Sequence, residues 1–247
     1  MNIANFENIE AINEPYPIWI IDNFFTEDTL KKLKSEWPAL DSELWHRGHE
    51  YINNKKNILE QGMRAISKVE DMPEYTADVL KYIHTDEFTQ KISDITNVEN
   101  LITDNSMRWS GLRTMMPGSF QAIHSDARLN PKNGFRKELT CLVYLNDGYD
   151  KEKDKGCFEV WDDEMTKCMH KIEPLDNRLV IFLNTDKSYH GVPSVNFERR
   201  AILWSVLKNE KAENRSKALF VSRPNDPEEI GELGKRRAYI KDAKNFK

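Results

Sequence analysis

The segment Ile123-His124-Ser125-Asp126 places an imidazole and a carboxylate two positions apart. Residues i and i+2 of a β-strand point to the same face of a sheet, so an extended chain brings His124 and Asp126 side by side. Together they are two of the three ligands of a facial triad for non-haem Fe(II). The same pattern also occurs by chance on protein surfaces, so the metal hypothesis depends on a third ligand and on the neighbouring sequence.

His190 is the candidate third ligand, in the segment Lys187-Ser188-Tyr189-His190-Gly191-Val192-Pro193. It lies on a later predicted strand, and strands distant in sequence become neighbours in a rolled sheet. His124, Asp126 and His190 would together hold a metal on one side and leave about three coordination positions open. Open positions make such a centre catalytic rather than structural.

Arg199 follows His190 by nine residues and opens an apolar strand. A buried guanidinium must be paired, and its planar fork suits a carboxylate, so a ligand carboxylate is a natural partner. The alternative is that Arg199 and Arg200 form an exposed strand edge with Glu198. Strand alternation puts the two arginines on opposite faces, so only one of them can enter a pocket.

The elements that must position these residues are short strands. After Asp104, apolar or alternating runs are separated by Gly, Pro, Asn and Asp, with Asn146-Asp147-Gly148 as a strong turn signal. Eight short strands at this spacing predict a sandwich, barrel or jelly roll. We expect the strands at about 107–116, 120–126, 138–146, 157–162, 167–172, 178–184, 187–192 and 198–207.

The N-terminal part is predicted to be mainly helical. A strand over Tyr16–Asp22 precedes a helix from the N-cap Thr26 to about Trp37, and Met72–Leu101 has apolar residues at helical spacing. Residues 39–70 are polar and predicted to be irregular. His46 and His49 lie close together there, and we interpret them as loop or surface histidines because no third metal ligand is near in sequence.

We therefore predict a single domain over residues 1–247. Residues 1–104 would form a strand and helical layer, 105–207 the β core, and 208–247 a C-terminal extension with an edge strand near 218–221 and a helix near 226–237. His84 is expected at a helix end.

The composition excludes several classes of protein. No apolar run approaches the ~18 residues of a membrane span, and the N-terminus has no signal-peptide pattern, so we expect no membrane partner. The cysteines Cys141, Cys157 and Cys168 have no disulfide or metal-binding spacing, which favours a reducing, cytoplasmic setting. The net charge of -5 hides a basic tail, since residues 208–247 contain eleven Lys or Arg and seven Asp or Glu. Without basic runs interleaved with aromatic residues, we predict no nucleic-acid partner.

Four stretches, in this order over residues 107–207, resemble the Fe(II)- and 2-oxoglutarate-dependent dioxygenases, and most closely their prolyl 4-hydroxylase-like branch. Each stretch is weak alone, but their combined order and spacing are specific. They are Ile123 to Asp126, Leu139-Thr140-Cys141-Leu142-Val143-Tyr144-Leu145-Asn146, Gly156-Cys157-Phe158-Glu159-Val160-Trp161, and His190 followed by Arg199 and Ala201.

The resemblance implies a mainly β, α+β fold: a double-stranded β-helix, or distorted jelly roll, buttressed by N-terminal helices. It implies Fe(II) bound by His124, Asp126 and His190, with 2-oxoglutarate as co-substrate and O2 as oxidant. Arg199 and Tyr144 would bind the distal carboxylate of 2-oxoglutarate. The products would be succinate, CO2 and a hydroxylated substrate, and ascorbate is a candidate reductant. Asp126 favours hydroxylation, because halogenating relatives lack this carboxylate.

The sequence departs from the family pattern in two places. Met115 and Met116 stand where the family often has a tyrosine that contacts the co-substrate, and Lys155-Gly156 stands in place of the usual double glycine. The nine-residue step from His190 and the trailing Ala201 favour Arg199 over Arg200 as the carboxylate partner.

The substrate is not specified by these motifs. The loop Ala127–Lys137 would line the mouth of the site, and its basic residues Arg128, Lys132, Arg136 and Lys137 favour an anionic small molecule or an acidic peptide, unless they are simply solvated. Trp109, Arg113 and Trp161 are further candidates for lining the site, although a core role is favoured for the two tryptophans. Prolyl hydroxylation of a peptide or protein is the nearest analogy, but a shared fold does not fix a substrate.

Two other functions remain open at the level of sequence. One is a cupin-like Zn or Mn isomerase or hydrolase with the same three ligands, for which Arg199 and Tyr144 would be superfluous. The other is a non-catalytic jelly-roll module that binds a sugar or peptide, in which the histidines are incidental.

Overall fold

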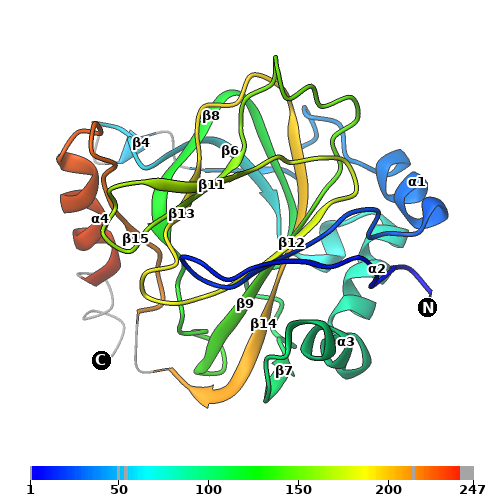
Figure 1. Ribbon diagram of the computed structural model, residues 1–247. Helices are drawn as coiled ribbons and strands as arrows, with labels where there is room; N and C mark the ends of the chain where they lie inside the picture. The colour runs from blue at the N-terminus through cyan, green and yellow to red at the C-terminus, as the bar shows by residue number, and fades with distance from the viewer. Residues whose placement is uncertain (1, 49–50, 53–54, 213–214, 240–247) are drawn as a thin grey trace.

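Antiparallel pairing joins 13 strands into one sheet that curls round on itself, as the computed structural model shows (Figure 1). The structure describes residues 2–48, 51–52, 55–212 and 215–239. The main strand order is β1-β2-β12-β9-β14-β8-β13-β10-β11. The bounds are β1 Glu10–Ile12, β2 Ile18–Ile21, β8 Gly111–Ser125, β9 Phe135–Tyr144, β10 Phe158–Trp161, β11 Cys168–Ile172, β12 Leu179–Leu183, β13 His190–Val192 and β14 Arg199–Lys211.

Shorter elements complete the fold. Strands β3 His46–Arg47, β6 Glu60–Ile66, β7 Leu101–Thr103 and β15 Leu219–Phe220 pair beside the main path, and β4 Tyr51–Ile52 pairs only with β5 Lys55–Lys56. The helices are α1 Glu27–Ser35, α2 Glu74–Ile83, α3 Asp86–Thr96 and α4 Glu229–Tyr239, with a 3-10 turn at Val69–Asp71. Helices α1 to α3 lie on one side of the curled sheet, and α4 lies with β15 on the other (Figure 1).

Strand β8 rolls the sheet because its two halves have different partners. Its first half pairs with β14, where Met115 lies opposite Arg199, and its second half pairs with β13, where His124 lies opposite His190. The predicted double-stranded β-helix is confirmed. The prediction of two separate strands here is wrong, because Pro117 and Gly118 interrupt the sequence pattern but lie exposed at a bend within one continuous strand.

The helical layer packs on the outer face of β9 and β14. Apolar residues of α2 and α3, such as Leu80, Phe88 and Ile92, share one buried cluster with Cys141 and Trp204. Fully burying side chains of this size contributes roughly 1.5–3 kcal/mol each, so this face stabilises the sheet. Residues 72–101 form two helices rather than one helical stretch, because the side chain of Thr85 caps α3 by accepting a hydrogen bond from Phe88 N.

The prediction of an irregular segment over residues 39–70 is wrong at β6. This strand carries glycine and several polar residues, and its side chains do not alternate between buried and exposed. It forms because β8 offers an unpaired edge, so sheet context overrides local preference. His46 is exposed on β3, whereas His49 lies outside the described residues.

The C-terminal extension contains the predicted strand and helix, β15 and α4. Within the described part of the chain, no helix combines the length and the apolar character needed to cross a membrane.

His84 ends α2, as expected, and makes a pH-dependent contribution to stability. Its buried Nε2 lies 2.8 Å from Ser110 Oγ, and burial lowers the pKa to about 4, with Asp104 opposing the shift. The folded protein therefore binds this proton less readily than the unfolded chain. The contribution is complete above the unfolded pKa near 6.5 and is lost as the pH falls through about 4.

We expect the wild-type protein to lose roughly 2 kcal/mol more stability than a His84→Asn variant when the pH falls from about 7.5 to about 5. Urea unfolding at the two pH values measures the difference. Equal losses for the two proteins would contradict the assignment.

Candidate active site

The register of β8 and β13 brings the three predicted ligands together. His124 and His190 are a direct cross-strand pair, and one ligand atom from each of His124, Asp126 and His190 lies within 4.8 Å of the others. Asp126 Oδ1 lies 3.5 Å from His124 Nε2 and 3.9 Å from His190 Nε2. Residues 66 positions apart in sequence thus present their donor atoms to one point.

Backbone carbonyls orient both imidazoles. His124 Nδ1 lies 3.0 Å from Ala122 O, and His190 Nδ1 lies 2.8 Å from Ser188 O. A carbonyl only accepts, so each Nδ1 carries the proton and each Nε2 keeps its lone pair for a metal. Burial and the neighbouring His124 lower the pKa of His190 to about 3, so this ring is neutral at physiological pH.

The second oxygen of Asp126 is held by protein groups. Lys137 Nζ donates to Asp126 Oδ2 at 2.6 Å, and Thr140 Oγ1 donates to the same atom at 2.9 Å. Burial disfavours the charged carboxylate, but the neighbouring Lys137 charge outweighs it and holds the Asp126 pKa well below its usual range. Asp126 is therefore ionised, with Oδ1 turned towards the histidines.

This donor set fits Fe(II). Two neutral imidazole nitrogens and one carboxylate oxygen converge from one side, and each ligand has a fixed hydrogen-bond partner behind it. Aromatic rings wall the histidines: Phe158 stacks on His190 at 5.1 Å, and Phe220 stacks on His124 at 5.0 Å.

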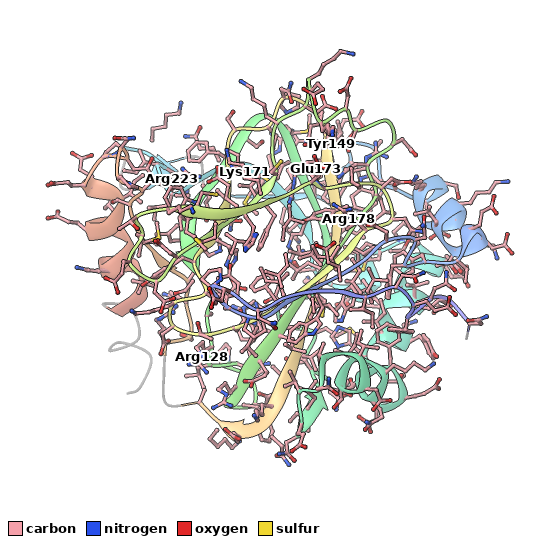
Figure 2. All side chains as sticks on the ribbon, viewed as in Figure 1. Arg128, Tyr149, Lys171, Glu173, Arg178 and Arg223 are labelled. Atoms are coloured by element: carbon pink, nitrogen blue, oxygen red, sulfur yellow. The ribbon has the colours of Figure 1, made fainter. Side chains whose placement is uncertain are left out.

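The C-terminal extension supports the His124–Asp126 segment from outside the core, which the sequence did not predict. Strand β15 pairs with β8 at His124 and Ser125. The Arg215 guanidinium donates to Ser125 O at 3.2 Å, Asp126 O at 3.0 Å and Ser125 Oγ at 2.6 Å. Arg223, beside α4 in Figure 2, bonds Glu159 at 2.9 Å. In sequence these arginines look like any others in a basic tail.

Arg199 and Tyr144 meet on the inner face of the sheet. Arg199 Nη2 donates to Tyr144 Oη at 3.1 Å, and the guanidinium lies over the tyrosine ring at 4.7 Å. Arg199 is 5% exposed, and no ion pair joins it to a carboxylate of any described residue. Arg200 points to the other face, where it bonds Glu198 and lies over Trp37. The expected alternation of the two arginines is observed.

Gly156 helps to place Arg199. Its carbonyl accepts from Arg199 Nε at 3.1 Å, and its φ of +103° is a conformation that side chains rarely adopt. A Cβ at this position would lie 2.6 Å from Val195 Cγ1. Met115, at one of the two positions where a tyrosine was expected, lies with Sδ 3.9 Å from Arg199 Nη1.

The positive charges predicted for the loop Ala127–Lys137 are largely neutralised by nearby carboxylates. Arg128 pairs with Asp186, Arg136 pairs with Glu138 and Glu210, and Lys137 is buried against Asp126. Figure 2 shows Arg128 on the side of the sheet away from α1.

Trp161, a further candidate for lining the site, donates its indole N–H to Glu159, which also binds Arg223.

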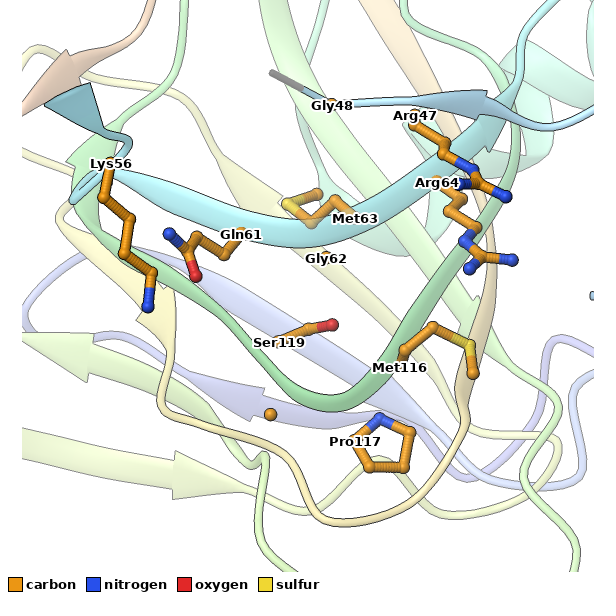
Figure 3. Close-up of a pocket in the computed structure, with 11 residues that line it drawn as sticks. Arg47, Gly48, Lys56, Gln61, Gly62, Met63, Arg64, Met116, Pro117 and Ser119 are labelled. Carbon is orange, nitrogen blue, oxygen red and sulfur yellow. The ribbon is translucent and has the colours of Figure 1, made fainter. Parts of the chain in front are cut away.

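A pocket of about 350 Å³ lies between β6 and the bend of β8 (Figure 3). Arg47, Arg64, Met63 and Ser119 are among its lining residues, but none of the triad residues is. Met63 packs with Met115, which separates this pocket from Arg199 by an apolar layer. We therefore place the chemistry at the triad.

A family model described as the 2OG-Fe(II) oxygenase superfamily matches residues 110–205, which contain all three candidate ligands, Tyr144 and Arg199. Over these residues the chain is similar to the 2OG-Fe(II) oxygenase superfamily. It is a dioxygenase that depends on Fe(II), 2-oxoglutarate and O2, as the sequence resemblance implied.

Solved prolyl hydroxylases share the fold of this oxygenase. A prolyl-4-hydroxylase from Pseudomonas putida has a TM-score of 0.57 and 18% identity, over 78% of this chain and 93% of that one. A prolyl hydroxylase from Trichoplax adhaerens, in complex with a hypoxia inducible factor oxygen degradation domain peptide fragment, has a TM-score of 0.56 and 17% identity, over 77% and 83% of the two chains. The comparison with curated proteins gives no match.

We expect Arg215→Ala to weaken Zn(II) binding by the oxygenase at least tenfold, because loss of groups that orient metal ligands typically costs about 10- to 100-fold in affinity. Isothermal titration measures the effect. Lys217→Ala removes a neighbouring positive charge without touching the His124–Asp126 segment and is the control. Equal affinities for the two variants would show that Arg215 does not position the segment.

Proposed function

We propose that this dioxygenase hydroxylates an unactivated C–H bond of an organic substrate. One atom of O2 enters the substrate as a hydroxyl. The other enters 2-oxoglutarate, which leaves as succinate and CO2. Fe(II) chelated by 2-oxoglutarate supplies the activation of O2 when both are bound.

The convergence of His124 Nε2, His190 Nε2 and Asp126 Oδ1 is the observation that carries this proposal. In it, these three atoms bind Fe(II), while Lys137 and Thr140 keep Asp126 ionised and correctly turned. The aromatic rings around the histidines keep bulk water away from the reacting atoms.

The Arg199–Tyr144 pair supports 2-oxoglutarate as the co-substrate. Thr140, which binds Asp126, and Tyr144 lie four positions apart on the same face of β9, so one molecule can reach both the metal and the pair. A buried guanidinium without a carboxylate partner among the described residues offers a bidentate site for the distal carboxylate. A cupin-like isomerase or hydrolase would have no use for this pair, and stoichiometric binding of iron distinguishes the dioxygenase from a sugar- or peptide-binding module.

The substrate in this proposal is either a prolyl residue of a peptide or a small molecule. The fold of prolyl hydroxylases, one of them solved with a peptide, supports the first. We also propose a cytoplasmic location, which the three free cysteines support.

Binding of Fe(II) and 2-oxoglutarate can be observed without any substrate. We expect a weak visible charge-transfer band when 2-oxoglutarate is added to the anaerobic Fe(II) protein, and its loss in His190→Ala. His124→Ala or Asp126→Ala should abolish substrate-independent 2-oxoglutarate turnover, measured as succinate release. Unchanged turnover in these variants would refute the ligand assignment.

Arg199→Ala should raise the KM for 2-oxoglutarate about 30-fold, because hydrogen bonds to a charged group contribute roughly 2 kcal/mol. Arg200→Ala is the matched control, since it removes the same side chain from the opposite face. If Arg200→Ala raises the KM and Arg199→Ala does not, the co-substrate site is misassigned by one residue.

A further inference from the structure

Arg113 is a second arginine on the inner face, and the proposed function does not use it. It lies opposite Ala201 on β14, and Ala201 lies opposite Tyr144 on β9. Directly opposite residues of an antiparallel pair point to the same face. The side chain of Arg113 is therefore on the face of the sheet that carries Tyr144 and Arg199.

The guanidinium of Arg113 has few partners. It donates to Leu112 O at 2.8 Å and to Trp109 O at a long 3.5 Å. Across residues 2–48, 51–52, 55–212 and 215–239, no carboxylate forms an ion pair with it. Burial lowers the pKa of Arg113 to about 10, which still leaves the group charged at neutral pH.

Solvent reaches the part of the inner face where Arg113 lies. Leu142 and Leu203 form a cross-strand pair there, and both are partly exposed, whereas Cys141 and Trp204 on the outer face are at most 1% exposed. Arg113 itself is partly exposed, although surrounding protein atoms lower its pKa. A side chain that is deep in the protein and still reachable by water is accessible to a ligand.

Trp109 connects Arg113 to the metal ligands. Its carbonyl accepts from Arg113, and Lys137 Nζ lies 5.2 Å from the centre of its ring. Lys137 in turn donates to Asp126 at 2.6 Å. Arg113 thus lies within a short series of contacts from the metal ligand Asp126.

The charges of the site leave Arg113 without a counter-ion. Asp126 and the two carboxylates of 2-oxoglutarate supply three negative charges, against four positive charges from Lys137, Fe(II) and Arg199 in the proposed function, so no negative charge is left over for Arg113. A largely desolvated guanidinium that has no carboxylate partner among the described residues is unfavourable, so an anion that joins it gains affinity.

We propose that Arg113 binds a carboxylate of the primary substrate, so that this dioxygenase hydroxylates a carboxylic acid. The inference rests on the proposed function and adds the substrate class. Trp109 forms an apolar wall beside the carboxylate, and the planar guanidinium holds the carboxylate through two parallel hydrogen bonds. This contact fixes the distance between the substrate carboxylate and the C–H bond presented to the metal.

The test uses the Zn(II)-loaded enzyme with saturating 2-oxoglutarate, which fills the Arg199 site without turnover. Isothermal titration compares acetate with acetamide, a neutral molecule of nearly the same shape. We expect acetate to bind at least tenfold more tightly. If acetamide binds with the same affinity as acetate, or if acetate does not bind at any concentration, the proposal is overturned.

Arg113→Gln should remove the preference for acetate and leave the Kd of 2-oxoglutarate unchanged. Arg108→Gln is the matched control, because it removes one positive charge from an exposed position five residues away. If Arg113→Gln weakens 2-oxoglutarate binding instead, Arg113 belongs to the co-substrate site and the proposal is wrong. Failure of the wild-type protein to bind Zn(II) and 2-oxoglutarate would refute the proposed function itself and is seen before any acetate is added.

The source of the carboxylate is tested with two further ligands. Free L-glutamate and a peptide with blocked ends and a single glutamate carry the same side-chain carboxylate. Tighter binding of the free amino acid identifies a small-molecule acid, and tighter binding of the peptide identifies an acidic protein segment. Either preference must disappear in Arg113→Gln if this residue recognises the carboxylate; its persistence there would count against the proposal.

Discussion

The direct pairing of His124 with His190 across β8 and β13 is the constraint on which the site depends. Side chains alternate along a strand, so a slip of one residue would turn one imidazole out of the roll. Gly191 permits this pairing, since a Cβ there would lie 2.7 Å from Ile123 Cδ1 and 2.9 Å from Gln121 O. Ala122 O, which orients the ring of His124, lies on β8, and Ser188 O, which orients the ring of His190, lies just before β13. The strand register therefore fixes the position of each ring, and the backbone two residues before each histidine fixes its tautomer.

The two faces of the rolled sheet differ in polarity: the outer face is apolar and the inner face carries the charged residues. The outer face of β9 and β14 is closed by α2 and α3 and contains the apolar cluster around Trp204. The inner face carries Asp126, Lys137, Arg199 and Arg113 among apolar residues. Charged groups in such surroundings are costly, so the outer face must supply the stability that tolerates them. This division explains why helices α1 to α3 gather on one side of the sheet (Figure 1).

Sequence reasoning succeeds here where chemistry and strand alternation coincide. The spacing of His124 and Asp126, and the opposite directions of Arg199 and Arg200, follow from the two-residue period of a strand. Sequence reasoning fails where a segment becomes a strand only because a neighbouring strand has an edge free for pairing, as β6 does beside β8. It also fails for Arg215, whose contacts with Ser125 and Asp126 join segments about 90 residues apart and leave no local pattern.

The support that Arg215 and Phe220 give to the His124–Asp126 segment has a consequence for biosynthesis. A chain emerges from the ribosome with its N-terminus first, so His124, Asp126 and His190 are made before the residues that hold them in place. Until residues 215–220 have been made, the imidazole of His124 lacks its stacking partner and β8 lacks β15. The donor atoms of His124, Asp126 and His190 therefore reach their final geometry only after synthesis has passed the strands that carry them.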